Sequence, residues 1–434
     1  MKNTKNLSYR SIAKWISTGF FLGNSNFFKN NIILKKNDKN YREWYRNKKN
    51  ISFQDAVDNF KTIFETRINK NVNGKKIILP LSGGLDSRTI ATALRHNKDV
   101  VAISYEFEGG LKETNYAEKI SNVYGWEFHK YVIKKGYLWD NLSELANITN
   151  CETEFTHPRQ MAVINKISNF GEVIISGQWG DVLFDSFGMK SNASIDDQIK
   201  KIMSIIIKPG GFEAAKELWK IWGLEKDFTT VMYDNIKRLL KEININEPNS
   251  RIRAFKSLYW APRWSDNNLK VFSTKNKVYI PYYEEKILNL ISELPENFLV
   301  NRNIQINYIK NNSYDLAMIP WQQYDLNLYQ YKKFNSLYFP RRVYRYSKRI
   351  FKEQILKRNK IIQRNWELQF IGKKNEARLK EWLFETDELK NIIPIEVIKK
   401  YYTKFKRVDP VKYSHPISMF LTLAVWSKNF WKKK

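Results

Sequence analysis

A glycine turn between an apolar strand and a helix limits the fold of this chain more than any other feature of the sequence. Residues 75–81 predict a buried strand and residues 87–96 predict a helix, with Gly83 and Gly84 between them. Two glycines at such a turn allow positive φ angles and a close approach of the backbone to an anion. The N–H groups at the start of a helix are unpaired and partly positive. The segment therefore predicts a phosphate-binding loop.

Strands and helices continue to alternate after this loop. Further strands are expected at residues 100–105, 129–133 and 171–176, and helices at 113–124 and around 161–168. This order favours an α/β fold with a doubly wound parallel sheet, which binds ligands at the carboxyl ends of its strands, beside a switch in strand order. From about Ser194 onward the apolar spacing becomes helical, and it includes the aromatic-rich residues 253–264. We therefore expect a mostly helical C-terminal lobe.

The side chains of the loop indicate which ligand it binds. The hydroxyls of Ser82 and Ser87 can donate hydrogen bonds to phosphate oxygens. Asp86 would repel a phosphate unless a divalent cation lies between the two anions, and Mg²⁺ binds carboxylate and phosphate oxygens together. The sequence thus predicts a phosphate and magnesium site, and the alternative is a plain turn in which Asp86 and Ser87 only cap the helix.

Several segments resemble one protein family. Residues 82–87, Ser-Gly-Gly-Leu-Asp-Ser, resemble the PP-loop of the ATP pyrophosphatase superfamily, whose fold is adenine nucleotide alpha hydrolase-like. Residues 176–184 are similar to the Ser-Gly-Glu-Gly-Ala-Asp-Glu-Leu-Phe stretch of asparagine synthetases, which are related to beta-lactam synthetase and lasso-peptide cyclase. Residues 278–284 resemble that family's Arg-x-Pro-Phe-Leu-Asp segment, residues 19–28 its interdomain linker, and residues 423–431 its closing helix.

The resemblance implies a division of the chain and a reaction. Residues 1–51 would form a short segment like the family's linker, 52–330 an asparagine-synthetase-like ATP pyrophosphatase domain, and 331–434 a basic helical region. A substrate carboxylate would attack the α-phosphorus of ATP, giving an acyl-adenylate and pyrophosphate. Ammonia or an amine would then open the adenylate to an amide. The implied cofactors are ATP and Mg²⁺.

The resemblance also implies roles for single residues. Pyrophosphate would be held by Ser82, Gly83, Gly84, Asp86 and Ser87, adenosine would lie near Ser176 and Gly177, and Mg²⁺ would be shared by Asp86 and Asp181. Arg88 replaces a common serine and is expected either to contact phosphate or to form a surface ion pair. Lys310 is a candidate for the family's late catalytic lysine by proximity only, because the sequence after Pro320 diverges.

Other departures concern the second half of the reaction. The family's glutaminase nucleophile, an N-terminal cysteine, is missing, because Lys2 follows Met1 and the only cysteine is Cys151. We therefore expect no glutamine hydrolysis by this chain, and a separate glutaminase is a candidate partner. Gln178, the candidate catalytic residue in this loop, replaces a glutamate that helps to deprotonate the nucleophile, and a neutral amide is no general base. Trp179 places a large ring where the family has glycine, which is expected to narrow or reshape the loop.

The charge of the chain leaves a second class of function open. The net charge is +30, and its densest source is the stretch 332–364, where aromatic residues are interleaved. This stretch is interpreted as a solvated helical face, with a polyanion such as nucleic acid as the alternative partner. A tRNA-modifying PP-loop enzyme is therefore one alternative to the amide ligase. The other is a ligase or cyclase that acts on a peptide or glycan carboxylate.

The location of the protein is also an expectation from the sequence. A single cysteine permits no intramolecular disulfide, no signal peptide is recognised, and the longest apolar run near the C-terminus, residues 419–426, is far shorter than the roughly 20 residues of a membrane span. We therefore expect a cytoplasmic protein without a membrane span.

Overall fold

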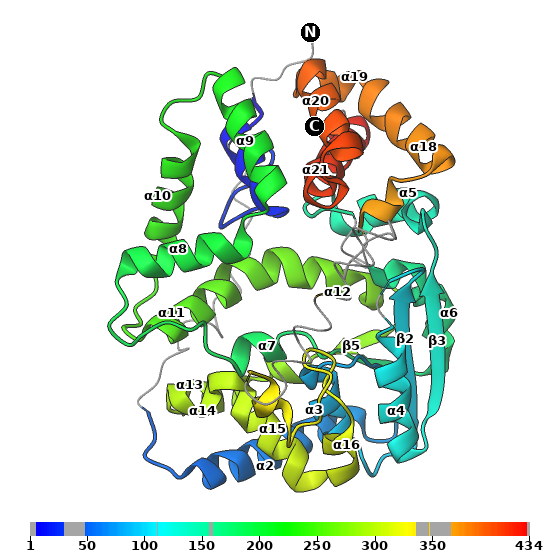
Figure 1. The fold of residues 1–434 in the computed structure, drawn as a ribbon, viewed down its shortest axis with the longest axis vertical. Coiled ribbons are helices and arrows are strands. Elements are labelled where there is room, and N and C mark those ends of the chain that lie inside the picture. Colours follow the sequence, from blue (N-terminus) through cyan, green and yellow to red (C-terminus); the bar gives the residue numbers. More distant parts are fainter. Residues whose placement is uncertain are drawn as a thin grey trace.

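A parallel sheet forms the centre of the molecule. The computed structural model describes residues 6–29, 48–110, 112–155, 159–335, 347 and 366–431. In these ranges the sheet has five strands in the order β3-β2-β1-β4-β5, and every neighbouring pair is parallel (Figure 1). The strands are β1 (Ile77–Pro80), β2 (Val100–Phe107), β3 (Glu127–Ile133), β4 (Val173–Ile175) and β5 (Lys277–Tyr279). The predicted parallel sheet is confirmed.

Helices cover both faces of this sheet. Successive side chains of a strand point to opposite faces, so neighbouring residues of β1 belong to different cores. Ile77 packs in one buried apolar cluster with α2 (Phe53–Val72), whereas Ile78 packs in the other with α5 (Tyr137–Thr149) and α21 (Pro410–Asn429). The sheet is therefore doubly wound, as the sequence predicts.

The order of the strands places two loops side by side. From β1 the chain runs outward through α3 (Leu85–Ala93), β2, α4 (Thr114–Tyr124) and β3, and it then returns to form β4 on the other side of β1. Ile77 pairs with Val100 of β2 and with Val173 of β4. The direction of winding thus switches between β1 and β4, which is where such sheets bind ligands. The loops that follow these two strands carry residues 81–84 and 176–179.

The helix expected around residues 161–168 is shorter than predicted. The chain forms instead a 3₁₀ turn at Arg159–Ala162, a single α-turn, α6 (Ile164–Ile167), and another 3₁₀ turn at Ser168–Phe170. Val163 separates the first two with φ −126°, outside the helical region. Short turns can bury their apolar side chains as one helix does, so the apolar spacing alone predicted a longer helix than the chain forms. The interruption lies at Val163, whose β-branched side chain lowers the helix propensity.

The predicted change to helical structure near Ser194 is confirmed. Ser194 caps α8 in a capping box with Asp197. The helices that follow are α8 (Ile195–Ile206), α9 (Pro209–Ile221), α10 (Phe228–Lys241), α11 (Pro248–Phe255), α12 (Asp266–Ser273), α13 (Glu285–Glu293), α14 (Glu296–Leu299), α15 (Asn303–Asn312) and α16 (Tyr314–Met318). Between α11 and α12 the backbone forms a π-helix at Lys256–Ser265, so α11, the π-helix and α12 form one nearly continuous rod across the molecule (Figure 1).

The two ends of the described chain meet on one side of this rod. Helix α1 (Tyr9–Thr18) packs on α9 and α21, and α21 packs on α18 (Lys373–Phe384), α19 (Asp387–Lys390) and α20 (Ile395–Arg407). These helices lie opposite α2, which is at the other end of the molecule (Figure 1). Within the described residues, none of the helices combines the length and the apolar character needed to cross a bilayer.

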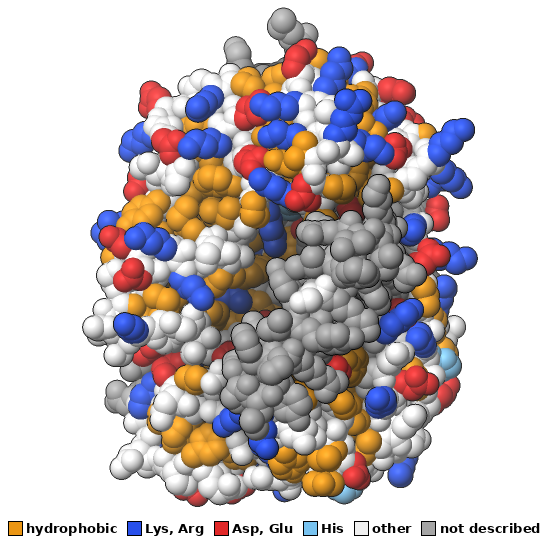
Figure 2. All heavy atoms as spheres, in the orientation of Figure 1, with side chains coloured by type: hydrophobic (Ala, Val, Ile, Leu, Met, Phe, Trp, Pro, Cys, Tyr) orange, Lys and Arg blue, Asp and Glu red, His pale blue; other side chains and the backbone are white. Residues whose placement is uncertain are grey.

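Basic side chains are spread over the described surface. Figure 2 shows Lys and Arg interspersed with Asp and Glu on this face, without one dominant basic patch. The stretch 332–364, on which the nucleic-acid interpretation depends, lies outside the described residues except for its first four residues and Ser347.

Candidate functional site

A pocket of about 490 Å³ lies where the loops after β1 and β4 leave the sheet. Its lining includes these residues from the predicted site: Ser82, Asp86, Ser87, Ser176, Gly177, Gln178 and Asp181. Two chain segments that are far apart in the sequence therefore meet at one cavity. Arg88 and Lys310 are not among its lining residues.

The first loop brings two hydroxyls together at the start of α3. Ser82 Oγ and Ser87 Oγ are 3.1 Å apart, and the Ser82 backbone N–H donates to Ser87 Oγ. Gly83 and Gly84 do not have the positive φ angles expected for them, and φ of Gly84 is −80°. The glycine at 83 is explained by packing instead, because a Cβ there would lie 2.6 Å from Gln322 Cβ. The loop thus packs closely against the segment that follows α16.

The second loop packs directly on the first. A Cβ on Gly177 would lie 3.1 Å from the backbone nitrogen of Ser87, which is tighter than most real contacts. A Cβ on Gly180 would lie 2.6 Å from Asp86 Cγ and closer still to its Oδ1. The absence of side chains at these two positions lets the β4 loop approach the carboxylate of Asp86 and the N-terminus of α3.

Asp86 and Asp181 form an interacting pair of carboxylates. Burial raises the pKa of Asp86 to about 6, the nearby Arg302 guanidinium lowers it, and the charge of Asp181 raises it further. Arg302 donates a hydrogen bond to Asp86 Oδ1, and Gln305 Nε2 donates to the same oxygen at 3.1 Å. No third His, Cys, Asp or Glu joins them to form a complete metal-binding group in the part of the chain that the structure describes. Two carboxylates alone suit Mg²⁺, which takes its other ligands from water and substrate phosphates.

Trp179 has a backbone conformation that glycine adopts more readily than other residues. Its φ is +81°, the left-handed conformation that glycine adopts without cost and that a bulky residue adopts at about 1–3 kcal/mol. The ring is buried, and its Nε1 donates to Ser257 Oγ at 3.3 Å. The indole packs against the π-helix, and the expectation that Trp179 narrows or reshapes the loop stays a prediction.

Four residues of the π-helix line the pocket and were not predicted as site residues: Ser265, and Lys256, Trp260 and Trp264, which are four residues apart. Lys256 Nζ lies 4.5 Å from the centroid of the Trp260 ring and 5.9 Å from that of Trp179. Burial lowers the pKa of Lys256, and the negative charge of Asp181 opposes this effect. The spacing of Lys256, Trp260 and Trp264 by four residues within an aromatic-rich segment is the signal from which these three could have been found.

Arg302 and Gln305 were also missed, and no local sequence signal indicates them. Arg302 immediately precedes α15, and Gln305 lies in the first turn of this helix. The chain is kinked just before α15, where Asn301 and Arg302 have φ of 56° and 62°. This kink directs Arg302 to Asp86 from a segment more than two hundred residues later in the chain. Only the folded chain brings these groups together.

Arg88 and Lys310 have other surroundings. The Arg88 guanidinium is fully buried and donates to the carbonyls of Ile319 and Pro320 at 2.8 and 3.0 Å, so it makes neither the phosphate contact nor the surface ion pair that were expected. Lys310 lies with Nζ 4.7 Å from the centroid of the Tyr329 ring. Glu284, at the family's aspartate position, pairs with Arg67 at 2.8 Å.

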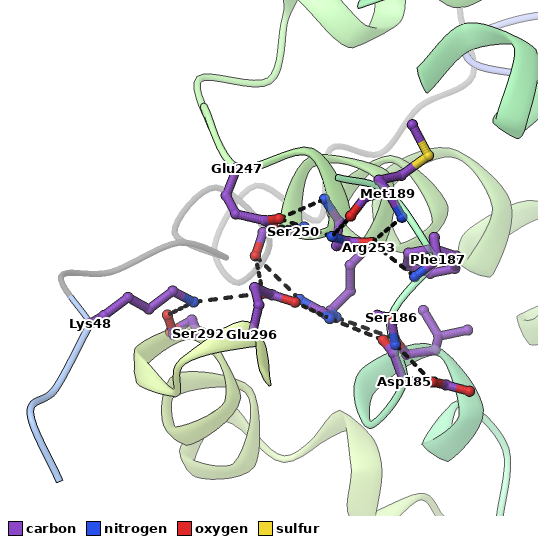
Figure 3. A network of polar contacts seen from close by, with 12 residues as sticks. Lys48, Asp185, Ser186, Phe187, Met189, Glu247, Ser250, Arg253, Ser292 and Glu296 are labelled. Atoms are coloured by element: carbon purple, nitrogen blue, oxygen red, sulfur yellow. Dashed lines mark hydrogen bonds and ion pairs between the residues drawn. The ribbon is translucent and has the colours of Figure 1, made fainter. Parts of the chain in front are cut away.

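A buried ion pair supports α7 (Gly180–Leu183), the short helix that carries Asp181 at the end of the second loop. Arg253 donates to both carboxylate oxygens of Glu296, at 2.9 and 3.0 Å (Figure 3). The same guanidinium donates to the carbonyls of Val182 and Asp185, just after Asp181. The position of Asp181 thus depends on a contact between this loop, α11 and α14.

Comparisons with known proteins identify the family of this chain. The family model "Asparagine synthase" matches residues 72–363, which include both loops and the π-helix. A similar solved structure is the NMN synthetase from Francisella tularensis, with 12% identity over 48% of this chain and 94% of that chain, and its TM-score of 0.25 is too low to support any conclusion. The search of curated proteins finds no match. Because the family model covers more than half of its residues, the chain belongs to the asparagine synthase family, and it is an enzyme of the ATP-dependent ligase or synthetase type.

Proposed function

We propose that the protein splits ATP into AMP and pyrophosphate to activate a carboxylate, and that ammonia or an amine then takes the acyl group to form an amide. The observation that carries this proposal is that Asp86 and Asp181 line one pocket beside the hydroxyls of Ser82 and Ser87. Paired carboxylates next to a helix N-terminus are suited to a nucleotide's phosphates with their cation.

The triphosphate binds at the loop after β1. The N-terminus of α3 and the Ser82 and Ser87 hydroxyls donate to the phosphate oxygens, with Gly83 and Gly84 allowing the backbone to come close. Each hydrogen bond to a charged group contributes roughly 1.5–3 kcal/mol. Ser176 and Gly177, at the end of β4, contact the adenosine.

The charges around Asp86 favour departure of pyrophosphate. Asp86 and Asp181 supply two oxygen ligands to Mg²⁺, which when bound neutralises the charge that develops on the leaving group. Arg302 adds a fixed positive charge beside Asp86. Fixed charges aimed at a leaving group stabilise the transition state without reorganisation.

The second step proceeds without a glutamate base at position 178. Gln178 lines the pocket, and its Oε1 is buried without a hydrogen-bond partner among the residues that the structure describes. This oxygen can accept a hydrogen bond from an N–H of ammonia or an amine, so Gln178 orients the nucleophile rather than deprotonating it. The nucleophile therefore enters as the free base.

The test is pyrophosphate release with ATP, Mg²⁺ and a panel of carboxylates, with and without ammonium or amines. Asp86→Asn and Asp181→Asn should each lower turnover by at least about 100-fold, the scale of one lost electrostatic contact to the transition state. Asp315→Asn, on the exposed face of α16, is the matched control and should leave turnover unchanged. Formation of ADP instead of AMP would overturn the proposal.

A further inference from the structure

The π-helix presents a row of side chains to the pocket. Lys256, Trp260, Trp264 and, at the start of α12, Asn268 are four residues apart and all line the cavity. In a helix with i→i+5 hydrogen bonds, residues four apart stay close to one face, and such helices are rare and frequent at functional sites. We call these four residues the indole wall.

Lys256 gives the indole wall an uncompensated positive charge. No ion pair joins Lys256 to a carboxylate in the described ranges, and its Nζ contacts the faces of Trp260 and Trp179 instead. A buried ammonium group that lacks a carboxylate partner is costly unless a ligand supplies an anion. Asp181 is near enough for its charge to act on Lys256, so an anion bound by Lys256 lies on the side of the phosphate site.

The indole wall also has two neutral polar atoms without a hydrogen-bond partner among the described residues. Asn268 Oδ1 and Trp260 Nε1 are buried, and neither forms a hydrogen bond with any residue that the structure describes. The amide nitrogen of Asn268 is already used, because Nδ2 donates to the Trp264 carbonyl at 2.7 Å. One free acceptor and one free donor that line the same pocket match hydroxyl groups, which can both donate and accept.

The charges at the indole wall argue against a substrate that places an ammonium group there. The carboxylates that line the pocket, Asp86, Asp181 and Glu113, are not part of the indole wall, and Arg159 adds a second cation to the lining. The indole wall itself has an ammonium and a neutral amide. An α-amino acid would bring a second cation next to Lys256, which repels it. A purely aromatic acid would suit the indoles but leave Asn268 and Trp260 unpaired.

We propose that the indole wall binds a sugar acid, a pyranose ring with a carboxylate, either free or at the end of a glycan. The ring packs on the indoles, its hydroxyls pair with Asn268 and Trp260, and its carboxylate meets Lys256. This inference rests on the proposed function: the carboxylate oxygen attacks the α-phosphorus, the bond to the β-phosphate breaks, and pyrophosphate leaves. An amine nitrogen then bonds to the acyl carbon and loses a proton while AMP departs with the electron pair.

The first experiment compares substrates by pyrophosphate release. The arms are glucuronate and galacturonate, a digalacturonide, L-aspartate and phenylacetate, each with ATP, Mg²⁺ and ammonium. At least one sugar acid should exceed L-aspartate and phenylacetate by about tenfold or more, and the digalacturonide distinguishes a glycan end from a free sugar. If L-aspartate or phenylacetate is used as well as any sugar acid, the inference is overturned while the proposed function stands.

The second experiment separates the indole wall from the chemistry. Trp260→Phe removes the N–H but keeps a ring, so KM for the sugar acid should rise about tenfold, the effect of one hydrogen bond, with KM for ATP unchanged. Lys256→Met should raise KM for the sugar acid on the order of 100-fold, because the lost contact is between two charged groups. Trp139→Phe, whose indole donates to the Gln369 carbonyl away from the pocket, is the matched control.

Direct binding keeps the two claims distinguishable. Calorimetry with α,β-methylene ATP present should detect the sugar acid bound to the wild type and bound more weakly to Trp260→Phe. If binding is seen but no carboxylate ever releases pyrophosphate, the proposed function fails and the sugar-acid site remains. If neither sugar acid binds to the wild type, the sugar-acid site is overturned.

Discussion

The two ends of the pocket are built in opposite ways. At the phosphate end, Gly177 and Gly180 let the chain after β4 pack against Asp86 and the start of α3 with no room for a methyl group, and Gly83 packs in the same way against Gln322. At the other end, the indole wall fills space with large side chains from a rare type of helix. The phosphate end thus depends on glycines, which leave space for close packing, and on fixed charges, whereas the indole wall depends on which large side chains are present. Substitutions at the two ends should therefore fail in different ways.

The largest effect is expected from adding one methyl group at the phosphate end. In Gly180→Ala the Cβ overlaps the Asp86 carboxylate, so this carboxylate must leave its present position. Pyrophosphate release should fall by about 1,000-fold, since a displacement of about 1 Å at a catalytic group already costs about 100-fold. Gly109→Ala, which meets no atom within 4 Å but has φ of +76°, should lose about 1 kcal/mol of stability and no activity. Equal activity losses in both variants would contradict this reading.

The next effect concerns the support of the Asp181 loop. Arg253→Met leaves the mostly buried Glu296 with only the longer ion pair to Lys48, at 3.7 Å, so it should lower the free energy of unfolding by about 3 kcal/mol in urea titrations. The double variant Arg253→Met with Glu296→Leu removes both charges and should recover most of this loss. It should still turn over more slowly than the wild type, because the carbonyls of Val182 and Asp185 have lost their donor. Additive losses in stability would show that the pair is not coupled.

A pH dependence is expected beside the indole wall. Burial raises the pKa of Asp266 to about 6, and Tyr283, which packs on Trp179, donates to it at 3.3 Å. The folded protein therefore keeps a proton that the unfolded chain releases between about pH 4 and pH 6, so stability falls as pH rises through that window. Asp266→Asn should gain about 2 kcal/mol over the wild type between pH 4 and pH 7. An unchanged difference across this range, measured by urea unfolding, would be evidence against it.

The smallest effect is expected behind the indole wall. Phe20 stacks on Trp260 with ring centroids 6.0 Å apart and planes 4° from parallel. Phe20→Leu keeps most of the apolar volume, so it should cost about 1 kcal/mol of stability and raise KM for the carboxylate severalfold, with KM for ATP unchanged. A change in KM for ATP alone would mean that the N-terminal segment supports the phosphate end instead.

The same contrast explains what the sequence could predict. The strand, turn and helix around Gly83 are encoded within about twenty residues, so the loop, the sheet and its switch point follow from local patterns. The roles assigned to Asp86 and Asp181 stay predictions, although both residues line one pocket. The position of Arg88 beside the loop did not predict its role, because its neighbours in sequence gave no sign that its guanidinium binds carbonyls after α16.

Arg302 depended on information that no local pattern carries, and the indole wall depended on it in part. Residues 256–264 indicated helix, and the four-residue spacing of Lys256, Trp260 and Trp264 is visible in the sequence, but it does not indicate which face meets the pocket. Arg302 reaches Asp86 through a kink whose two non-glycine residues have positive φ, a conformation that tertiary contacts impose.

The central claim is that Asp86 and Asp181 share one cation with a bound nucleotide. A crystal grown with Mn²⁺ and α,β-methylene ATP tests it directly, because anomalous scattering locates the metal. The account predicts a single anomalous peak within bonding distance of one carboxylate oxygen from each aspartate and of a phosphate oxygen. A peak that contacts only one of the two aspartates, or neither, would contradict it.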